Sequence, residues 1–345
     1  MAGVPMRKRK KNGFFRTVLA AMVCMALIVG GIRLFGSPQG ESGQTVTIRI
    51  PQGATGTDVA QLLGEWGVVK SPLLYKLAAR FYGAAYQPGV YDLTIGDSYA
   101  QIIQTLNGAP NSASYVRVLI PEGFEARQIA DRLAENGIVS REAFEQAINS
   151  TDYDFDFLSS ITDKGKRTYA LEGYLFPDTY EFERGMMAEE VVKVFLNRFE
   201  QVFSAVCDQT RLDELGMTAD EVVTLASIIE REALSDADRG LVSGVFHNRL
   251  KRTDYMNRLQ SCATVQYILK ERKPVLSTED TQIKSPYNTY LNPGLPVGPI
   301  ANPGRASLSA ALHPEQTDCL YFGLAASGRH VFSRTYEEHL AAMAQ

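Results

Sequence analysis

The order of hydrophobic and polar positions occurs twice in the first half of the chain. An apolar stretch typical of a β-strand at residues 46–50 is followed by a Pro-x-Gly turn and an amphipathic helix that ends at a glycine. The same order begins again at residue 116, an offset of 70 residues, and the second halves of the two copies match at an offset of 89. The second copy therefore contains 19 additional residues between Ala147 and Pro177. This pattern predicts two α+β units, each with the order strand, helix, helix, strand, helix.

A well-marked helix is predicted from Thr218 to Leu234. Thr218 and Glu221 form a capping-box pattern, and no Gly or Pro follows until Gly240. The apolar residues that share one arc of this helix are Val222, Val223, Ala226, Ile229, Ala233 and Leu234. Glu230 lies inside this arc, whereas Glu232 lies on the opposite face and is predicted to be a solvated surface charge.

Glu230 is the candidate functional residue of the helix, because a carboxylate on an apolar face is costly unless it is paired or protonated. One interpretation is a buried glutamate that is satisfied by an arginine or a backbone donor. The other is an acid kept protonated so that it can donate a proton. The small neighbours Ala226, Ser227 and Ala233 favour the second interpretation, since they leave space for a ligand beside the carboxyl group.

Further elements are predicted around this helix. They are helices at residues 188–207, 238–252 and 305–313, a hairpin formed by residues 319–324 and 329–333, and a last helix from Thr335. The segment at residues 285–304 is rich in Pro and Gly and is predicted to be a long ordered loop, which is usually functional. Its amides and Tyr rings suit the hydroxyls and apolar faces of sugars. The alternative is a structural lid that makes no substrate contact.

The N-terminus has the pattern of a membrane anchor. Residues 1–36 contain seven bases and no acid, and the 22 residues from Phe14 to Phe35 would span about 33 Å as a helix. The basic tail at residues 1–13 precedes this segment, so the N-terminus is predicted to stay in the cytoplasm and the remainder to be exported. The alternative is a cleaved signal peptide. Residues 36–44 have the composition of a flexible linker.

The remaining composition restricts the chemistry. The 345 residues are 45% hydrophobic with a net charge of −4, which indicates a folded protein. The basic cluster belongs to the N-terminus, so nucleic-acid binding is not expected. His247 has no second ligand at metal spacing, so neither a metal nor another cofactor is expected. Cys262 and Cys319 would both be exported, and a disulfide between them that pins the loop is a hypothesis.

Several motifs occur together in a family-specific order. They are Glu172-Gly-Tyr-Leu-Phe-Pro-Asp-Thr-Tyr180, Leu225-Ala-Ser-Ile-Ile-Glu-Arg-Glu232, Val245-Phe-His-Asn-Arg-Leu250, Arg258-Leu-Gln-Ser-x-x-Thr-Val265, Tyr287-Asn-Thr-Tyr290 and Gly294-Leu-Pro-x-Gly-Pro-Ile300. With the N-terminal segment, this combination resembles the MltG (YceG-like) family of endolytic murein transglycosylases. The resemblance implies an α+β fold with a transmembrane helix, a LysM-like module at residues 45–112 and a catalytic domain at residues 113–345. That domain comprises the second repeat unit at 113–200 and a mainly helical part with the glutamate-bearing helix and substrate loop at 201–345.

The resemblance also implies a reaction. Glu230 would act as a single acid and then base to cleave the β-1,4 bond between MurNAc and GlcNAc, leaving a 1,6-anhydroMurNAc end. Candidate substrate-binding residues are Gln260, Tyr287, Asn288 and Tyr290, and Arg249 is expected to hold the loop or an anionic group of peptidoglycan. The alternatives are a hydrolase that uses water, and a non-catalytic, membrane-anchored cell-wall-binding protein.

The implied setting is the bacterial cytoplasmic (inner) membrane, crossed once, with the catalytic domain outside the cytoplasm. The partners would be peptidoglycan glycan strands and the membrane itself, with cell-wall synthases as candidate protein partners. In this setting the enzyme would trim or terminate newly made strands.

Overall fold

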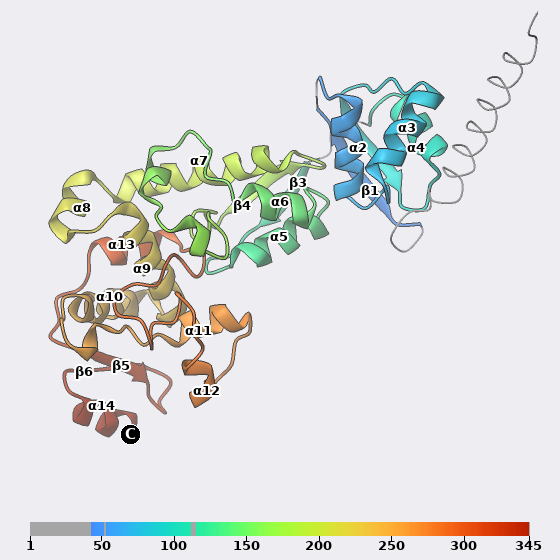
Figure 1. The fold of residues 1–345 in the computed structure, drawn as a ribbon. Coiled ribbons are helices and arrows are strands. Elements are labelled where there is room, and N and C mark those ends of the chain that lie inside the picture. The colour runs from blue at the N-terminus through green and yellow to red at the C-terminus, as the bar shows by residue number, and fades with distance from the viewer. Residues whose placement is uncertain (1–42, 52, 112–114, 345) are drawn as a thin grey trace, which may run out of the picture. The chain divides into compact units, whose positions relative to one another are not determined.

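The computed structural model describes residues 43–51, 53–111 and 115–344, and it divides the chain into a unit that ends at Ser114 and a unit from Tyr115 to the C-terminus (Figure 1). The predicted membrane segment at residues 14–35 lies outside the described residues. Among the helices of the described residues, none has the length and apolarity needed to cross a membrane.

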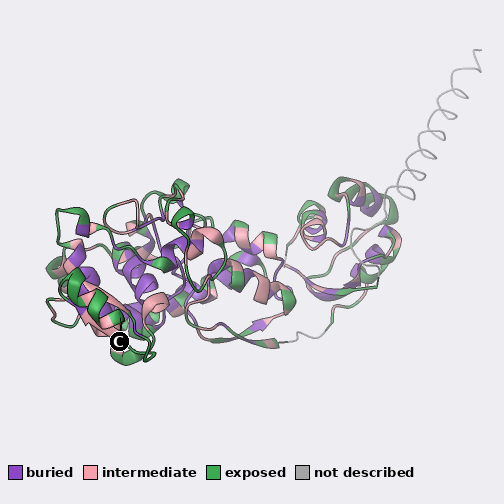
Figure 2. Cartoon of the chain, turned by 90° about the horizontal axis from the view of Figure 1, so that it is seen from below, coloured by how far each residue is buried: buried purple, intermediate pink, exposed green. Residues whose placement is uncertain are grey.

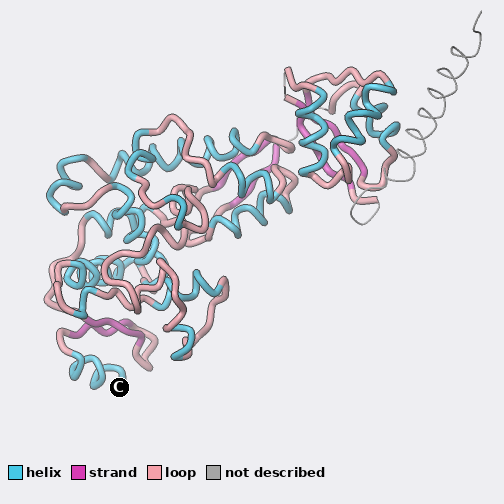
Figure 3. Tube along the Cα trace, viewed as in Figure 1, coloured by secondary structure: helices cyan, strands magenta, loops and turns pink. Residues whose placement is uncertain are grey.

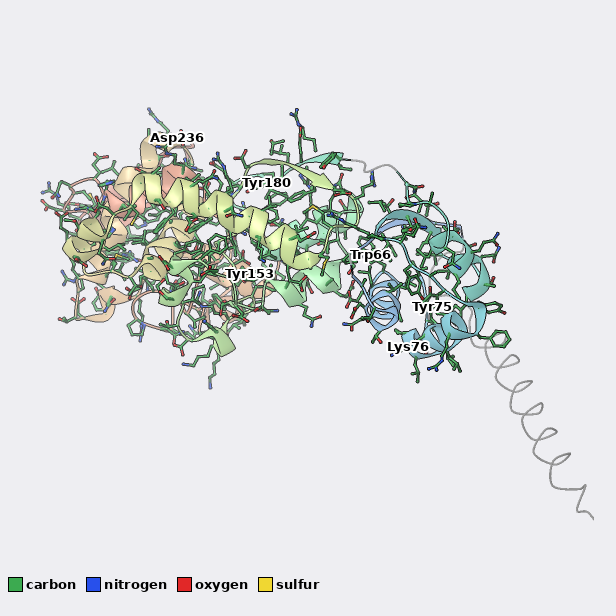
Figure 4. All side chains as sticks on the ribbon, turned by 90° about the horizontal axis from the view of Figure 1, so that it is seen from above. Trp66, Tyr75, Lys76, Tyr153, Tyr180 and Asp236 are labelled. Atoms are coloured by element: carbon green, nitrogen blue, oxygen red, sulfur yellow. The ribbon has the colours of Figure 1, made fainter. Side chains whose placement is uncertain are left out.

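The first unit contains the predicted order strand, helix, helix, strand, helix. Its elements are β1 (Thr45–Ile50), α2 (Gly56–Glu65), α3 (Pro72–Tyr82), β2 (Gly89–Thr94) and α4 (Tyr99–Leu106). The two strands pair antiparallel, with Thr45 opposite Thr94 and Ile50 opposite Gly89. Ile48, Leu63 and Tyr75 are fully buried. They belong to a hydrophobic core formed by residues of the two strands and the helices (Figure 4 labels Tyr75).

The second unit begins with a second copy of this arrangement. Its elements are β3 (Tyr115–Leu119), α5 (Ala126–Glu135), α6 (Arg141–Ala147), β4 (Thr179–Glu183) and α7 (Ala188–Val206). β3 and β4 pair antiparallel, with Tyr115 opposite Glu183. Gly67 after α2 and Gly137 after α5 both have φ near +67°, which favours glycine and ends the equivalent helices in the same way. The repeat predicted from the sequence is therefore confirmed at the level of elements.

The additional residues of the second copy join it to the rest of the unit. They form two short 3₁₀ turns, η1 (Asp156–Ser160) and η2 (Lys164–Lys166). Phe157 stacks on Tyr174 with ring centroids 5.7 Å apart. Arg167 forms a buried, two-pronged ion pair with Asp220, and Tyr174 also donates to Asp220 at 2.7 Å. The insertion thus fixes the start of the helix that carries Glu230.

The remainder of the second unit is mainly helical. Its elements are α8 (Gln209–Leu215), α9 (Ala219–Glu232), α10 (Asp236–Leu250), η3 (Tyr255–Asn257), α11 (Cys262–Leu269), α12 (Thr278–Thr281), α13 (Arg305–Leu312), β5 (Tyr321–Leu324), β6 (His330–Ser333) and α14 (Tyr336–Met343). The predicted C-terminal hairpin and last helix are confirmed, since β5 and β6 pair antiparallel and Thr335 caps α14. Figure 3 shows long loop segments between these short elements.

Helix α9 differs from its prediction in two respects. Every residue from Val222 to Ile229 is buried, so the helix is covered on all sides rather than on one arc. Figure 2 shows buried residues within both units of the chain. The helix ends at Glu232, and the predicted member Leu234 lies beyond it with 54% of its surface exposed. The polar Thr224 and Ser227 can be buried because hydroxyls can be satisfied inside the protein, as Ser227 is by the carbonyl of Thr224.

Candidate functional site

The site is built at the C-terminal end of α9. Thr218 caps the helix as predicted, with its hydroxyl accepting from the Glu221 N–H at 3.2 Å and the Glu221 carboxylate accepting from the Thr218 N–H at 2.8 Å. This cap and the Arg167–Asp220 pair fix the beginning of the helix. Because α9 is buried along its length, the position of its last turn is set by packing, which is the rigid support that a catalytic side chain needs.

The Glu230 carboxylate is held by two donors. Its Oε1 accepts from Arg239 Nη2 at 3.0 Å, and its Oε2 accepts from the backbone N–H of Gly304 at 3.0 Å. The side chain is 7% exposed. One interpretation of the sequence is a buried glutamate satisfied by an arginine or a backbone donor, and the structure contains both of these partners.

Arg239 lies in the first turn of α10 and is itself held from three sides. It pairs with Glu230 and Asp236, and its Nε donates to the hydroxyl of Ser307 on α13 at 2.9 Å. Asp236 is exposed at the start of α10, where Figure 4 labels it. Arg239 therefore links the ends of α9, α10 and α13 around the Glu230 carboxylate. Arg239 was not predicted from the sequence, although it lies only nine positions after Glu230.

The prediction that Glu232 is a solvated charge is wrong. Its Oε1 accepts from the hydroxyl of Ser261 and from the backbone N–H of Ala263 at 3.4 Å. The reason is the next segment of the chain, which places the start of α11 against the end of α9. A carboxylate at the first turn of a helix is stabilised by the free N–H groups there. Glu232 thus connects α9 to the segment that contains Gln260.

Gln260 is the predicted substrate-binding residue with the most accessible position. It is exposed, and its backbone has φ of +50°, an uncommon conformation for a residue other than glycine. Its N–H donates to the carbonyl of Thr289 at 3.1 Å, so the loop at 285–304 holds it in place. Arg249, by contrast, is 7% exposed, and its guanidinium donates to the carbonyls of Leu259 at 2.9 Å and Leu320 at 2.6 Å. Both carbonyls lie outside the loop at 285–304, so the two roles expected for Arg249 stay predictions.

The predicted residues of the Tyr287–Tyr290 motif lie mostly inside the loop. Tyr287 is 3% exposed, and its hydroxyl accepts from the Thr168 N–H at 3.1 Å. Asn288 is fully buried, and its amide donates to the carbonyls of Thr281 and Ile283 at 3.0 and 2.8 Å. These contacts stabilise the loop rather than present the side chains to solvent.

Tyr290 lies beside Cys262. Tyr290 is partly buried, and its hydroxyl lies 3.0 Å from the sulfur of Cys262. In the structure Cys262 and Cys319 carry free thiols, as does Cys207. The pairing of Cys262 with Cys319 stays a prediction. His247 is 6% exposed and contacts the carbonyl of Ala311 at 2.9 Å.

A second buried acid, Glu172, lies against Asn302, close to the end of the loop that contains Gly304. Glu172 is fully buried and accepts from the Ala126 N–H at 2.9 Å, from the Tyr267 hydroxyl at 3.1 Å and from the Asn302 amide at 2.9 Å. Asn302 in turn accepts from the N–H groups of Gly173 and Leu175, each at 2.9 Å. Burial raises the pKa of Glu172 to about 8, and the neighbouring Glu125 carboxylate adds to the shift. These contacts position the loop end that delivers Gly304 to Glu230.

Comparison with known proteins gives this arrangement its context. Residues 48–345 match the model of the YceG-like family. The chain is 33% identical over 327 residues to an endolytic murein transglycosylase of Bacillus subtilis, covering 91% of this chain and 89% of that protein. It is 28% identical over 323 residues to endolytic murein transglycosylases of two Streptococcus pneumoniae strains, and it spans 58% of their length.

A solved structure agrees with these sequence matches. The crystal structure of a YceG-like protein from Listeria monocytogenes has 31% sequence identity and a TM-score of 0.57, covering 87% of this chain and 99% of that chain. The family match extends through both α+β units and through the end of α9. This chain therefore belongs to the YceG-like family.

Proposed function

We propose that this protein is an endolytic lytic transglycosylase, which cleaves the β-1,4 bond between MurNAc and GlcNAc within peptidoglycan strands. Supporting this proposal, the relatives from Bacillus subtilis and Streptococcus pneumoniae are named endolytic murein transglycosylases. The observation that carries it is the placement of Glu230, a nearly buried carboxyl group at the end of a helix fixed on all sides.

The simplest chemistry assigns both proton transfers to Glu230. The protonated side chain gives its proton to the oxygen that leaves between MurNAc and GlcNAc. The resulting carboxylate then takes the proton of the MurNAc 6-hydroxyl, whose oxygen attacks C1 of the same sugar. The product is a 1,6-anhydroMurNAc end, and no water is consumed. Intramolecular attack is favoured because the nucleophile is already in place. Gln260 and Tyr290 border this end of α9 and are the proposed glycan contacts.

The reaction is tested by mass spectrometry of isolated peptidoglycan treated with the full-length protein, with Glu230→Gln as the matched variant. The amide keeps the shape of the side chain but cannot exchange a proton, so anhydro ends are expected with the wild type and not with the variant. Anhydro ends are lighter than hydrolytic ends by one water, about 18 Da, so the two products are distinguished directly.

Two other outcomes correspond to the alternative functions. Reducing ends in place of anhydro ends would indicate a hydrolase in which water is the nucleophile, a reaction that ordinarily needs two carboxyl groups. Unchanged glycan with the wild type, together with binding to it, would indicate a non-catalytic cell-wall-binding protein. In that case Glu230→Gln would also leave binding unchanged.

We propose in addition that residues 14–35 anchor the enzyme in the cytoplasmic membrane with the catalytic unit outside, where it trims or terminates strands as the synthases make them. The sequence supports this with a basic tail followed by an uncharged apolar segment. Replacement of residues 1–36 by a cleaved signal peptide is expected to abolish the effect on glycan length in cells. Full function of the released protein would contradict this placement.

A further inference from the structure

A second carboxyl group, that of Glu122, lies against Gly304, the same residue whose N–H binds Glu230. Gly304 separates the two. Its N–H donates to Glu230 Oε2 at 3.0 Å, and a Cβ added to Gly304 would overlap the Glu122 carboxyl group. From the other direction, a Cβ added to Gly123 would lie 3.6 Å from Cγ of Glu230. The Pro-x-Gly turn of the second repeat unit is therefore packed against the end of α9.

The backbone of this turn is fixed. Gly123 has φ of +74°, its N–H donates to the carbonyl of Asn302 at 2.9 Å, and its carbonyl accepts from Arg231 Nη1 at 2.9 Å. The side chain of Glu122 is not held in the same way. Glu122 is exposed, and within the part of the chain that the structure describes no hydrogen-bond donor is paired with its carboxyl group. A rigid backbone thus presents an accessible acid beside Glu230.

The two carboxyl groups have different surroundings. Glu230 is 7% exposed, and both of its oxygens accept from donors, Arg239 and the Gly304 N–H. Partial desolvation raises the pKa of Glu122, and the negative charges of Glu230 and Asp236 raise it further, while Arg239 opposes them. The two acids thus differ in their partners, since Glu230 is paired with donors and, among the described residues, Glu122 is not, and such differences in environment can assign the roles of acid and base.

We propose that Glu122 is a second catalytic carboxyl group, which donates the proton to the leaving oxygen, while Glu230 acts as the base. This inference rests on the proposed function and divides its two proton transfers between two residues. The Glu122 acid gives its proton to the bridging oxygen, and the C1–O bond breaks with its electron pair remaining on that oxygen. The MurNAc 6-oxygen bonds to C1, and its proton passes to the Glu230 carboxylate. Transfer of that proton through solvent to Glu122 restores the starting state.

The repeat supplies a conservative variant for the test. At the position equivalent to Glu122, between Pro51 and Gly53, the first repeat unit has Gln52. A glutamine therefore already occurs in a Pro-x-Gly sequence of this chain, and Glu122 is exposed, so Glu122→Gln is expected to fold. Circular dichroism verifies this, and Glu122→Asp, which keeps the acid but shortens it, serves as a second variant.

The experiment compares two substrates with the full-length enzyme. One is peptidoglycan, and the other is a GlcNAc-MurNAc glycoside of nitrophenol, whose leaving group departs without a proton. Glu122→Gln is expected to reduce kcat on peptidoglycan about 100- to 10,000-fold and to change kcat on the nitrophenyl glycoside by less than about fivefold. It is also expected to remove the alkaline limb of the pH profile on peptidoglycan, because that limb reports loss of the proton from the acid. Glu230→Gln is expected to lose activity on both substrates.

The outcomes separate this inference from the function on which it rests. A wild-type rate of Glu122→Gln on peptidoglycan would overturn the acid role, and so would an equal loss on both substrates, which indicates a structural role. Activity of Glu230→Gln on peptidoglycan would instead contradict the proposed function. Glu181→Gln is the matched control, since Glu181 is an exposed glutamate of the same unit, paired only with the exposed Arg117 among the described residues.

Discussion

Replacement of Glu172 by glutamine is expected to change how the stability of the second unit depends on pH. Glu172 is fully buried, and burial together with the nearby Glu125 carboxylate raises its pKa from about 4.5 to about 8. Between these two values the folded state holds a proton that the unfolded chain has lost. The free energy of unfolding therefore falls as the pH rises through this window.

The magnitude follows from the size of the shift. One pKa unit corresponds to about 1.4 kcal/mol, so the carboxyl group of Glu172 is expected to cost about 1.4 kcal/mol of stability for each pH unit between about 5 and 8. Across that range the difference in free energy of unfolding between Glu172→Gln and the wild type should change by up to about 4 kcal/mol in favour of the variant. The three donors around Glu172 remain in both proteins, so they contribute a constant offset and not a slope.

The assay is urea denaturation at several pH values, followed by far-UV circular dichroism, which reports mainly the helices of the second unit. Trp66 is the only tryptophan in the sequence and lies at the end of α2 in the first unit, so its fluorescence follows that unit separately. The free energies of unfolding of the wild type and Glu172→Gln are plotted against pH. The two lines should converge or cross when unfolding is followed by circular dichroism, and they should stay parallel when it is followed by Trp66 fluorescence. Parallel lines in both signals would refute the reasoning, and Glu181→Gln should match the wild type throughout.

Two further predictions concern the supports of the site. Arg167→Met removes both hydrogen bonds that Arg167 gives to Asp220 and leaves a buried carboxylate, so the second unit should lose about 3–5 kcal/mol in urea denaturation. Adding Asp220→Asn should recover part of this loss, and an additive double variant would contradict the explanation. Gly304→Ala places a methyl group where the Glu122 carboxyl group lies, so peptidoglycan cleavage should fall at least tenfold with little change in melting temperature; undiminished cleavage would argue against a role for this position.

The elements of the fold were largely predictable because their signals are local. The two repeat units follow from strand patterns, Pro-x-Gly turns and glycines that end helices, and the glycine positions have the positive φ values that such turns need. The cap of α9 follows from Thr218 and Glu221 alone. These signals depend on neighbouring residues and on backbone sterics, so they can be recognised in the sequence without knowledge of the tertiary contacts.

The prediction for α9 failed where distant segments decide the environment. The exposure of Glu232 and the burial of Leu234 were predicted only from the positions of these residues around one helix. In the structure the start of α11 supplies donors to Glu232, and the helix ends before Leu234. Similarly, Asn288 and Tyr287 have side chains that suit a sugar, but their hydrogen bonds to the loop and to Thr168 direct them inward. Residue type alone does not distinguish a ligand contact from an internal one.

The sequence by itself determined the repeated α+β units, the capped helix and the choice of Glu230 as the residue on which the proposed function depends. Only the tertiary structure decided what surrounds that residue. Arg239, Gly304 and Glu122 come from α10, from the end of the long loop and from a turn more than 100 residues earlier in the chain. Electrostatic and hydrogen-bond environments depend on distances in space, and the packing of separate segments against the end of α9 fixes those distances.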